Sequence, residues 1–379
     1  MKILSPREKK INKIVNLILL IALLGVLILI DSTSNSVDMI VKVLQKGCVY
    51  AIVCVSMNLL NGFTGLFSLG QAGFMLIGAY TFSIFSVSNA DRAAVYGFSG
   101  TPAINVELPI LLAIILGGLV AALLAFLIGL PVLKLKSDYL AIATLGFAEI
   151  LRTLIQWDKL GPITNGSFPI SRLNTFKKLL EGTIFEKMSF VVPFFIAAFI
   201  CIGAVALLIN STYGRAFKAI RDDEIAASAM GINLAKHKMI SFVVSSFFAG
   251  VGGALYAIFV GSINAAPFTS ALTYEILLIV VIGGIGSITG SVLASFLYIA
   301  SQEWWLRGLD SGTFLGISSP LFRNGFRLVV FSVIIMIFVL FFSRGIMGTN
   351  EFSPMGIWNY FRDFKKNHFN KSKKAKDNQ

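Results

Sequence analysis

The sequence predicts an all-α fold, a polytopic bundle of helices that cross a membrane. Three observations predict it: 56% of the 379 residues are hydrophobic, 13% are charged, and the hydrophobic residues form long runs. The charged share is about half that of an ordinary soluble domain. A bilayer core about 30 Å thick is crossed by a helix of about 20 apolar residues, so several runs are long enough.

About ten candidate spans follow one another along the chain. The clear ones are Ile14–Ile30, Leu108–Leu130, Phe190–Ile209, Ile240–Val260, Tyr274–Ile282 with its flanks, and Phe326–Phe342. Those that contain glycine, charge or polar groups are Val37–Leu60, Leu66–Phe85, Leu140–Trp157 and Ser291–Trp305. The first run follows a basic segment, as a signal peptide does. It is long for a signal peptide and no cleavage motif follows, so we expect an uncleaved span.

The distribution of positive charge predicts that both termini are cytosolic. With ten spans and the N-terminus inside, most Lys and Arg residues fall in cytosolic segments, as the positive-inside rule requires. This asymmetry explains the net charge of +13 without a nucleic-acid partner. We therefore expect a transmembrane domain at residues 1–345, with a cytosolic loop at about 210–238. A basic cytosolic tail at 346–379 would contact anionic lipid.

Two blocks are unusually rich in glycine, Asn58–Phe74 and Ile282–Gly290. Close helix packing explains many single glycines in membrane helices. The first block also contains the polar residues Asn58, Asn61, Ser68 and Gln71, which need partners away from water. Because irregular backbone at membrane depth is tolerated only inside protein or along a cavity, we expect a broken or re-entrant segment. Those four residues are the candidates for lining a translocation path.

Two charges lie inside a predicted span, Glu149 and Arg152. They are three residues apart, so they share one face of a helix and can form an ion pair. Charge at such a position indicates a functional site, with a structural pair between helices as the alternative.

The loop Gly214–Asn233 is a polar interruption between two spans. Asp222, Asp223 and Glu224 suit the first turn of a helix, and Gly231 suits its C-terminal end. This pattern predicts an amphipathic helix of about ten residues, from Asp222 to Met230. So short a helix needs something against its apolar face. That surface is either the membrane and the chain's own helix ends, or a groove on a cytosolic partner.

The chain itself has no signature of a catalytic or metal site. Its three cysteines and two histidines lie far apart, and no Gly-Lys-Ser/Thr motif for an ATP-binding loop occurs. We therefore expect no enzyme activity, no metal and no cofactor in this chain. Any ATP and magnesium would be held by other subunits.

The loop resembles the coupling segment of ABC-importer permeases, whose signature is Glu-Ala-Ala, three residues, then Gly. Counting back from Gly231, Ile225 stands at the signature's Glu position, and the acid Glu224 lies one residue early. Arg221–Asn233, together with Asn61–Phe74, Leu135–Phe147 and Gly283–Gly290, resembles the LivM-type permeases of branched-chain amino-acid importers in content and order.

The resemblance implies a permease domain at residues 1–345 in a bacterial cytoplasmic (inner) membrane. It implies three kinds of partner: a related LivH-type permease, two cytosolic ATPase subunits and an extracytoplasmic binding protein. The solutes implied are leucine, isoleucine and valine. The residues expected to couple to the ATPases are Arg215, Arg221, Asp223, Glu224, Ala227 and Gly231. The alternatives are a permease for another small solute, such as urea, an amide or a nucleoside, and a stand-alone secondary transporter.

Overall fold

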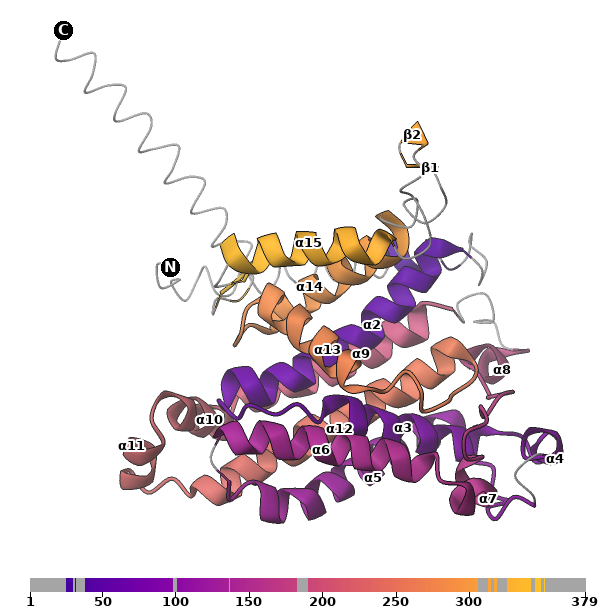
Figure 1. Ribbon diagram of the computed structural model, residues 1–379, viewed down its shortest axis with the longest axis horizontal. Coiled ribbons are helices and arrows are strands. Elements are labelled where there is room, and N and C mark those ends of the chain that lie inside the picture. The colour runs from indigo at the N-terminus through magenta and orange to yellow at the C-terminus, as the bar shows by residue number, and fades with distance from the viewer. Residues whose placement is uncertain are drawn as a thin grey trace, which may run out of the picture.

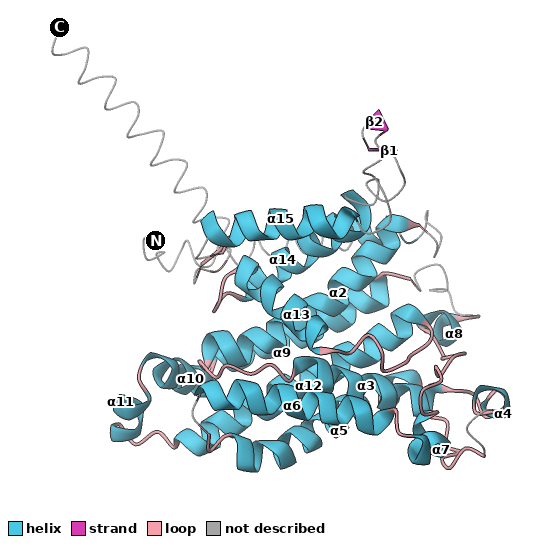
Figure 2. Cartoon of the chain, in the orientation of Figure 1, coloured by secondary structure: helices cyan, strands magenta, loops and turns pink. Residues whose placement is uncertain are grey.

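The computed structural model describes residues 25–29, 31, 38–97, 101–135, 137–182, 190–305, 313–314, 317–318, 326–341, 345–348 and 351. This part of the chain is built almost wholly from helices (Figures 1 and 2). The longer helices are α2 (Met39–Asn58), α3 (Gln71–Ser86), α5 (Ile110–Val132), α6 (Ser137–Ile155), α9 (Val192–Asn210), α12 (Leu234–Val260), α13 (Ser270–Gly283), α14 (Ile288–Ala300) and α15 (Phe326–Phe341).

Short elements connect these helices. They are η1 (Leu59–Phe63), α4 (Arg92–Val95), η2 (Asp158–Leu160), α7 (Gly161–Thr164), α8 (Phe176–Leu180), α10 (Thr212–Asp222), α11 (Glu224–Ala229) and η4 (Ser301–Trp305). Two strands of two residues each, β1 (Thr313–Phe314) and β2 (Ile317–Ser318), pair antiparallel.

The helices agree with the predicted all-α fold class. The structure accounts for fewer spans than the ten predicted. Four helices are long and apolar enough to cross a membrane, and six spans result if each of two bent pairs counts as one. The first predicted span lies mostly outside the described residues, as do the basic N-terminal segment and most of the tail. Every other predicted span overlaps a helix. The count of ten and the cytosolic termini stay predictions.

Helix α12 lies at the centre of the bundle and packs against α2, α3 and α5. Glycine permits the closest approach in this core. A Cβ atom added at Gly78 of α3 would lie 2.0 Å from the carbonyl oxygen of Gly250 in α12. Any larger residue at that contact would push the two backbones apart, so this glycine serves helix packing.

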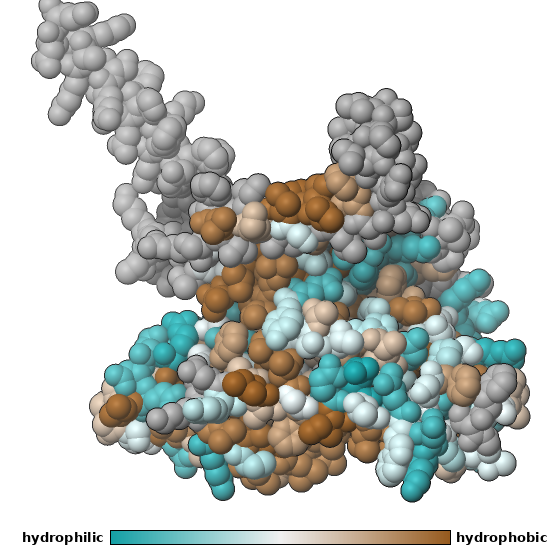
Figure 3. Space-filling view, in the orientation of Figure 1, coloured by the Kyte–Doolittle hydropathy of each residue, from teal (hydrophilic) through white to brown (hydrophobic). Residues whose placement is uncertain are grey.

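The two ends of the bundle differ. Helices α10 and α11 protrude at one end, and α4, α7 and α8 lie at the other (Figure 1). At the second end, the amide nitrogen of Asn165 donates hydrogen bonds to the carbonyl oxygens of Val95 and Pro169. The space-filling view has hydrophilic surface at both ends and much hydrophobic surface between them (Figure 3). This is the pattern of a chain whose middle lies in a bilayer.

The second glycine block forms the turn between α13 and α14, where the helix axis bends by 120°. Gly284 and Gly286 have φ angles of +117° and +90°, which residues with a side chain rarely adopt. The backbone amides of Ile346 and Met347 donate to the carbonyl oxygens of Ile282 and Gly283, which holds the segment after α15 against this turn.

Candidate functional site

The loop predicted to be one helix folds as two, so the predicted range Asp222–Met230 is wrong. Asp222 ends α10, and α11 runs only from Glu224 to Ala229. The break is at Asp223, whose backbone is extended with φ −160° and ψ 114°. Its carboxylate accepts hydrogen bonds from the amides of Ile225 and Ala226, at 2.8 and 3.0 Å. Asp223 is therefore the N-cap of α11 and not a first-turn residue.

Gly231 ends α11 in a left-handed conformation, with φ +83°. The amide of Ile232 donates to the carbonyl oxygen of Ala227 over 3.1 Å, and the amide of Gly231 donates to Ser228. A left-handed residue just past the helix, with a hydrogen bond reaching back over the last turn, is a Schellman-type cap. Both ends of this six-residue helix are thus fixed locally.

The apolar side chains of α11 and its cap point mainly to solvent. Ile225 is 84% exposed and Met230 is 83% exposed, whereas Ala227 is only 4% exposed and faces the protein. Because α11 lies close to the rest of the chain at Ala227, only a small side chain fits at this position. The helix and its cap therefore present two large apolar groups that the described residues leave uncovered.

A salt bridge between α11 and α12 holds α11 in place. The Glu224 carboxylate and the Lys238 ammonium lie 2.7 Å apart, with the Lys238 side chain 14% exposed. Asn233 caps α12 by accepting a hydrogen bond from the amide of Lys236. The sequence prediction did not include Lys238, because it lies 14 residues after Glu224 and on a different helix.

Helix α10 contacts the first glycine block directly. The Arg221 guanidinium donates to the carbonyl oxygen of Gly62 over 3.2 Å and pairs with Asp222. The Lys218 ammonium lies 5.7 Å from the centre of the Phe63 ring. Arg215 is exposed on the same helix. Of the predicted coupling residues, Arg215, Arg221 and Asp223 are all exposed, and Arg221 also contacts the bundle through Gly62.

The first glycine block is a break between α2 and α3. The end of α2 widens into the π-helical turn Leu59–Phe63, and residues 65–70 form no helix or strand before α3 begins at Gln71. The predicted span Leu66–Phe85 therefore begins with non-helical backbone. Gly65 has φ +76° and packs against the stem of Arg221.

Asn58 joins the two glycine blocks. Its amide nitrogen donates to the Ser287 carbonyl oxygen and the Ser291 hydroxyl, at 2.8 and 2.7 Å. Its amide oxygen accepts from the amide of Gly286 over 2.8 Å. The side chain is fully buried. Gly62 is needed beside it, because a Cβ there would lie 1.9 Å from the Asn58 oxygen.

The other polar groups of the break are also hydrogen bonded to neighbours. The Gln71 amide donates to the hydroxyls of Ser56 and Ser245, at 2.6 and 3.4 Å. Asn61 and Ser68 bond to each other within the break. Sequence reasoning missed Ser56 and Ser245, because single serines in apolar helices carry no pattern. In this conformation Asn58 and Gln71 join helices, whereas Asn61 and Ser68 bond only within the break.

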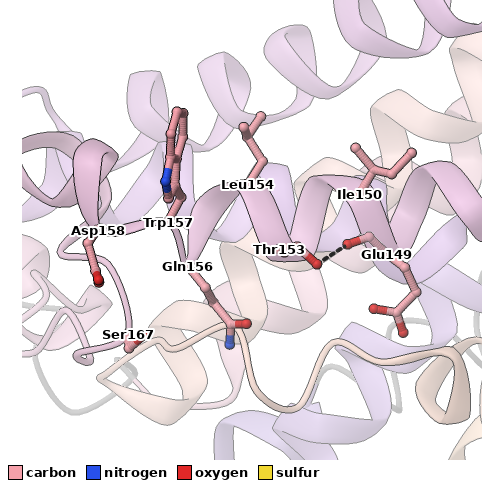
Figure 4. Close-up of a pocket in the computed structure, with 8 residues that line it drawn as sticks. All are labelled: Glu149, Ile150, Thr153, Leu154, Gln156, Trp157, Asp158 and Ser167. Atoms are coloured by element: carbon pink, nitrogen blue, oxygen red, sulfur yellow. Dashed lines mark hydrogen bonds between the residues drawn. The ribbon is translucent and has the colours of Figure 1, made fainter.

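The two charges predicted inside a span both project from α6. The Arg152 guanidinium donates to the Glu149 carboxylate over 2.6 Å and to the Gln156 amide oxygen over 3.4 Å. The pair lies on one helix and does not join two helices. An open groove of about 640 Å³ runs beside it, lined by polar and apolar side chains of α6 and of the segment that follows it (Figure 4). The sequence prediction did not find this groove.

Within the described residues, no group of three or more His, Cys, Asp or Glu side chains is placed to hold a metal ion. The site has no catalytic constellation among these residues. It has an exposed, capped helix at one end of the bundle, a buried polar junction behind it, and a groove toward the other end. These parts suit conformational coupling across a membrane better than chemistry on a substrate.

Comparison with known proteins agrees with the family resemblance found in the sequence. Residues 39–343 match the family described as branched-chain amino acid transport system / permease component. The high-affinity branched-chain amino acid transport system permease protein LivM of Salmonella typhimurium is 33% identical over 278 residues, 67% of this chain. The matched region spans 61% of that relative.

More distant relatives have related descriptions. The ribose import permease protein RbsC of Haemophilus influenzae is 28% identical, over 74% of this chain and 82% of its own. The permease protein LivH of Salmonella typhimurium is 24% identical, over 80% of this chain and 93% of its own. No solved structure matches the chain.

Proposed function

Since the chain belongs to the family of branched-chain amino acid transport system permease components, we propose that it is the transmembrane permease subunit of an ABC importer. It moves a small solute inward across a bacterial inner membrane, and leucine, isoleucine and valine are the solutes proposed. ATP hydrolysis takes place in partner subunits. The observation that carries the proposal is the capped helix α11, which presents the uncovered side chains of Ile225 and Met230.

The proposed partners are two cytosolic ATPase subunits, a second LivH-type permease and an extracytoplasmic binding protein. An ATPase groove would cover Ile225 and Met230, since helix-in-groove docking uses exposed apolar anchors. The end of the bundle that carries α10 and α11 is then cytosolic. The proposal keeps about ten spans, cytosolic termini, a permease domain at 1–345 and a cytosolic tail at 346–379.

Coupling proceeds from α11 to the interior through contacts that the chain already makes. Closure of the ATPases moves α11 and, through Lys238 and Arg221, the start of α12 and the first glycine block. Asn58 passes this motion to the turn between α13 and α14. The candidate path residues can line the path only if their present hydrogen bonds are replaced by contacts with solute when the permease changes conformation. These residues are Asn58, Asn61, Ser68 and Gln71.

Transport by defined components tests the proposal. The chain is reconstituted in proteoliposomes with the second permease, the ATPases and the binding protein, and uptake of radiolabelled leucine is measured with and without ATP. We expect ATP-dependent uptake by the complex and none by the chain alone. Uptake by the chain alone would contradict the proposal in favour of a stand-alone secondary transporter.

The resemblance to a ribose import permease favours a second candidate, the same machine with another solute. Competition with excess unlabelled isoleucine, ribose, urea and adenosine separates the two. Inhibition by isoleucine alone is expected. Complete indifference to isoleucine, with competition by one of the others, would reassign the solute but not the class of transporter.

A further inference from the structure

The segment that follows α15 is bound to the turn between α13 and α14, a contact that the coupling path described above does not use. Helix α15 runs toward the side of the molecule where α10 and α11 lie (Figure 1). Beyond it, the amides of Ile346 and Met347 donate to the carbonyl oxygens of Ile282 and Gly283, at 2.8 and 3.1 Å. The last carbonyl groups of a helix have no partner within it, so this segment completes the C-terminal end of α13.

Glu351 binds the other side of the same turn. Its carboxylate accepts hydrogen bonds from the amides of Ile288 and Thr289, at 2.8 and 3.0 Å, and from the Thr289 hydroxyl at 2.6 Å. A negative charge is favourable at this position, the N-terminus of α14. The helix also has a cap of its own, because the Ser287 hydroxyl accepts from the amide of Gly290 over 3.1 Å. Glu351 is therefore an addition to the cap, and α14 can form without it.

Glycine lets the backbone of this segment lie directly on the backbone of the turn. A Cβ added at Gly284 would lie 2.4 Å from the carbonyl oxygen of Gly348, and one added at Gly345 would lie 2.6 Å from the carbonyl oxygen of Val281. Gly345 and Gly348 have φ angles of +71° and +58°, which glycine adopts without strain. The fit depends on backbone atoms, so a single added methyl group would disturb it.

The turn is also held from the interior of the bundle. Asn58 is bonded to Gly286 and Ser287, and a Cβ added at Gly286 would lie 3.4 Å from the Arg221 guanidinium. Arg221 moves with α10 in the proposed cycle, and a turn fixed on both sides cannot follow that motion. Asn58 is fully buried, whereas Glu351 is exposed, so water can replace the hydrogen bonds of Glu351 at little cost. The outer contact is thus the one that can open.

We propose that residues 345–348 and Glu351 form a latch, the tail latch, which is closed on the α13–α14 turn in this structure and opens in each transport cycle. Glu351 is its positioning residue, because it holds the start of α14 and contacts no solute. The closed latch opposes movement of the turn and thereby restrains ATP hydrolysis when no solute is present. The inference rests on the proposed function, because that function requires the turn to move with α10.

Reversible cross-linking in the full reconstituted complex tests whether the latch must open. The double variant Ile282→Cys with Ile346→Cys places thiols at two positions whose backbones share a 2.8 Å hydrogen bond, within reach of a short, reducible thiol cross-linker. The three native cysteines are buried, so the unsubstituted complex treated with the same reagent is the background. We expect the cross-linked complex to lose nearly all ATP-driven leucine uptake and to regain it on reduction, while each single variant keeps it. Full uptake with the cross-link in place would overturn the proposal.

Weakening the latch should have a different signature. Glu351→Gln removes the charge, and Gly345→Ala disturbs the backbone fit without changing Glu351. Both should raise ATP hydrolysis in the absence of solute and binding protein roughly ten-fold, and lower uptake per ATP hydrolysed. Asp363→Asn removes the same charge from a later position in the sequence and should change neither quantity. A purely structural role would lower hydrolysis and uptake together, and that result, or unchanged hydrolysis in both variants, would contradict the latch.

Leucine uptake by the unsubstituted complex, measured in parallel, separates failure of the latch from failure of the proposed function. ATP-driven uptake that the cross-link does not affect removes the latch and leaves the proposed function standing. Absence of ATP-driven uptake from the complete unsubstituted complex counts against the proposed function itself. Retention of the ATPase subunits by each variant, and recovery of the cross-linked complex on reduction, show that the variants are folded.

Discussion

The guanidinium of Arg221 donates a hydrogen bond to the carbonyl oxygen of Gly62, a residue that lies 159 positions earlier in the chain. The contact joins a helix that protrudes from the bundle to the turn in which α2 ends. The neighbouring Gly65 lies against the aliphatic stem of the same arginine. Movement of α10 thus acts directly on the break between α2 and α3, and this is the mechanical link that the proposed function requires.

Loss of this link should uncouple ATP hydrolysis from transport. Arg221→Ala removes a hydrogen bond from a charged donor, worth about 1.5–3 kcal/mol, so uptake per ATP hydrolysed should fall roughly ten-fold or more. ATPase association should persist, because Ile225 and Met230 stay in place. The measurement is leucine uptake against phosphate release in the same proteoliposomes. Lys236→Ala, a change of charge at another exposed position nearby, is the control. An unchanged ratio in Arg221→Ala would show that the contact is not used.

Gly231 gives a prediction based on backbone conformation alone. Its φ is +83°, and a Cβ added there meets nothing within 4 Å, so a substitution brings strain without a clash. Gly231→Val should destabilise the end of α11 by about 1–2 kcal/mol and weaken ATPase binding roughly ten-fold. Gly231→Asn should bind nearly normally, because asparagine tolerates this conformation. The measurement is the affinity of purified ATPase for the reconstituted permease. Equal affinities for the two variants would mean that the cap does not position the docking surface.

Much of the fold follows from hydropathy and from local chain chemistry. The apolar runs that predict spans overlap helices, and Gly231 after the amphipathic stretch predicts where α11 ends. The start of α11 was predicted wrongly for a physical reason. Asp222, Asp223 and Glu224 are all favourable near a helix N-terminus, so composition does not say which one is the cap. The hydrogen bonds of Asp223 decide it.

The candidate site depends on contacts that no local pattern encodes. Asn58 is bonded to Gly286, Ser287 and Ser291, which are more than 220 positions away. The sequence indicates that a buried asparagine needs partners, but not where they lie. The groove on α6 is different, because its polar residues have helical spacing. Only the charged pair Glu149 and Arg152 was identified from the sequence. Thr153 and Gln156 have the helical spacing that extends this pair into a polar stripe.

Charge reversal at Glu224 separates positioning from direct contact. Glu224→Lys places two ammonium groups near each other and should weaken ATPase binding several-fold, since a pair with this exposure contributes about 1 kcal/mol or less. The double variant Glu224→Lys with Lys238→Glu restores the pair in reverse. If Glu224 only positions α11, the double variant should recover binding, measured by titration with the ATPase. Failure to recover would assign Glu224 a contact with the partner.

Asn58 predicts a large effect on stability. Asn58→Ala leaves the amide of Gly286 and the carbonyl oxygen of Ser287 buried with one partner fewer, at a cost of about 1–3 kcal/mol for each group left unsatisfied. Because about 1 kcal/mol shifts the midpoint by only about 1–2 °C in a chain of this length, the thermal midpoint of the purified complex should fall by roughly 2–5 °C. Asn61→Ala loses only the local bonds to Ser68 and should shift the midpoint much less. A smaller shift for Asn58→Ala than for Asn61→Ala would exclude the junction as a structural centre.

Ile225 and Met230 predict the docking surface most directly. Both are more than 80% exposed, and neither is needed to fold α11, whose two ends are held by Asp223 and Gly231. Anchor residues of an interface typically cost about 2 kcal/mol or more when removed, so Ile225→Asp should weaken ATPase binding about 30-fold. Val106→Asp, at a 52% exposed apolar position at the other end of the bundle, is the control. Binding of the isolated ATPase to Ile225→Asp with unchanged affinity would place the docking surface elsewhere, since no other change in the permease is expected from an exposed side chain.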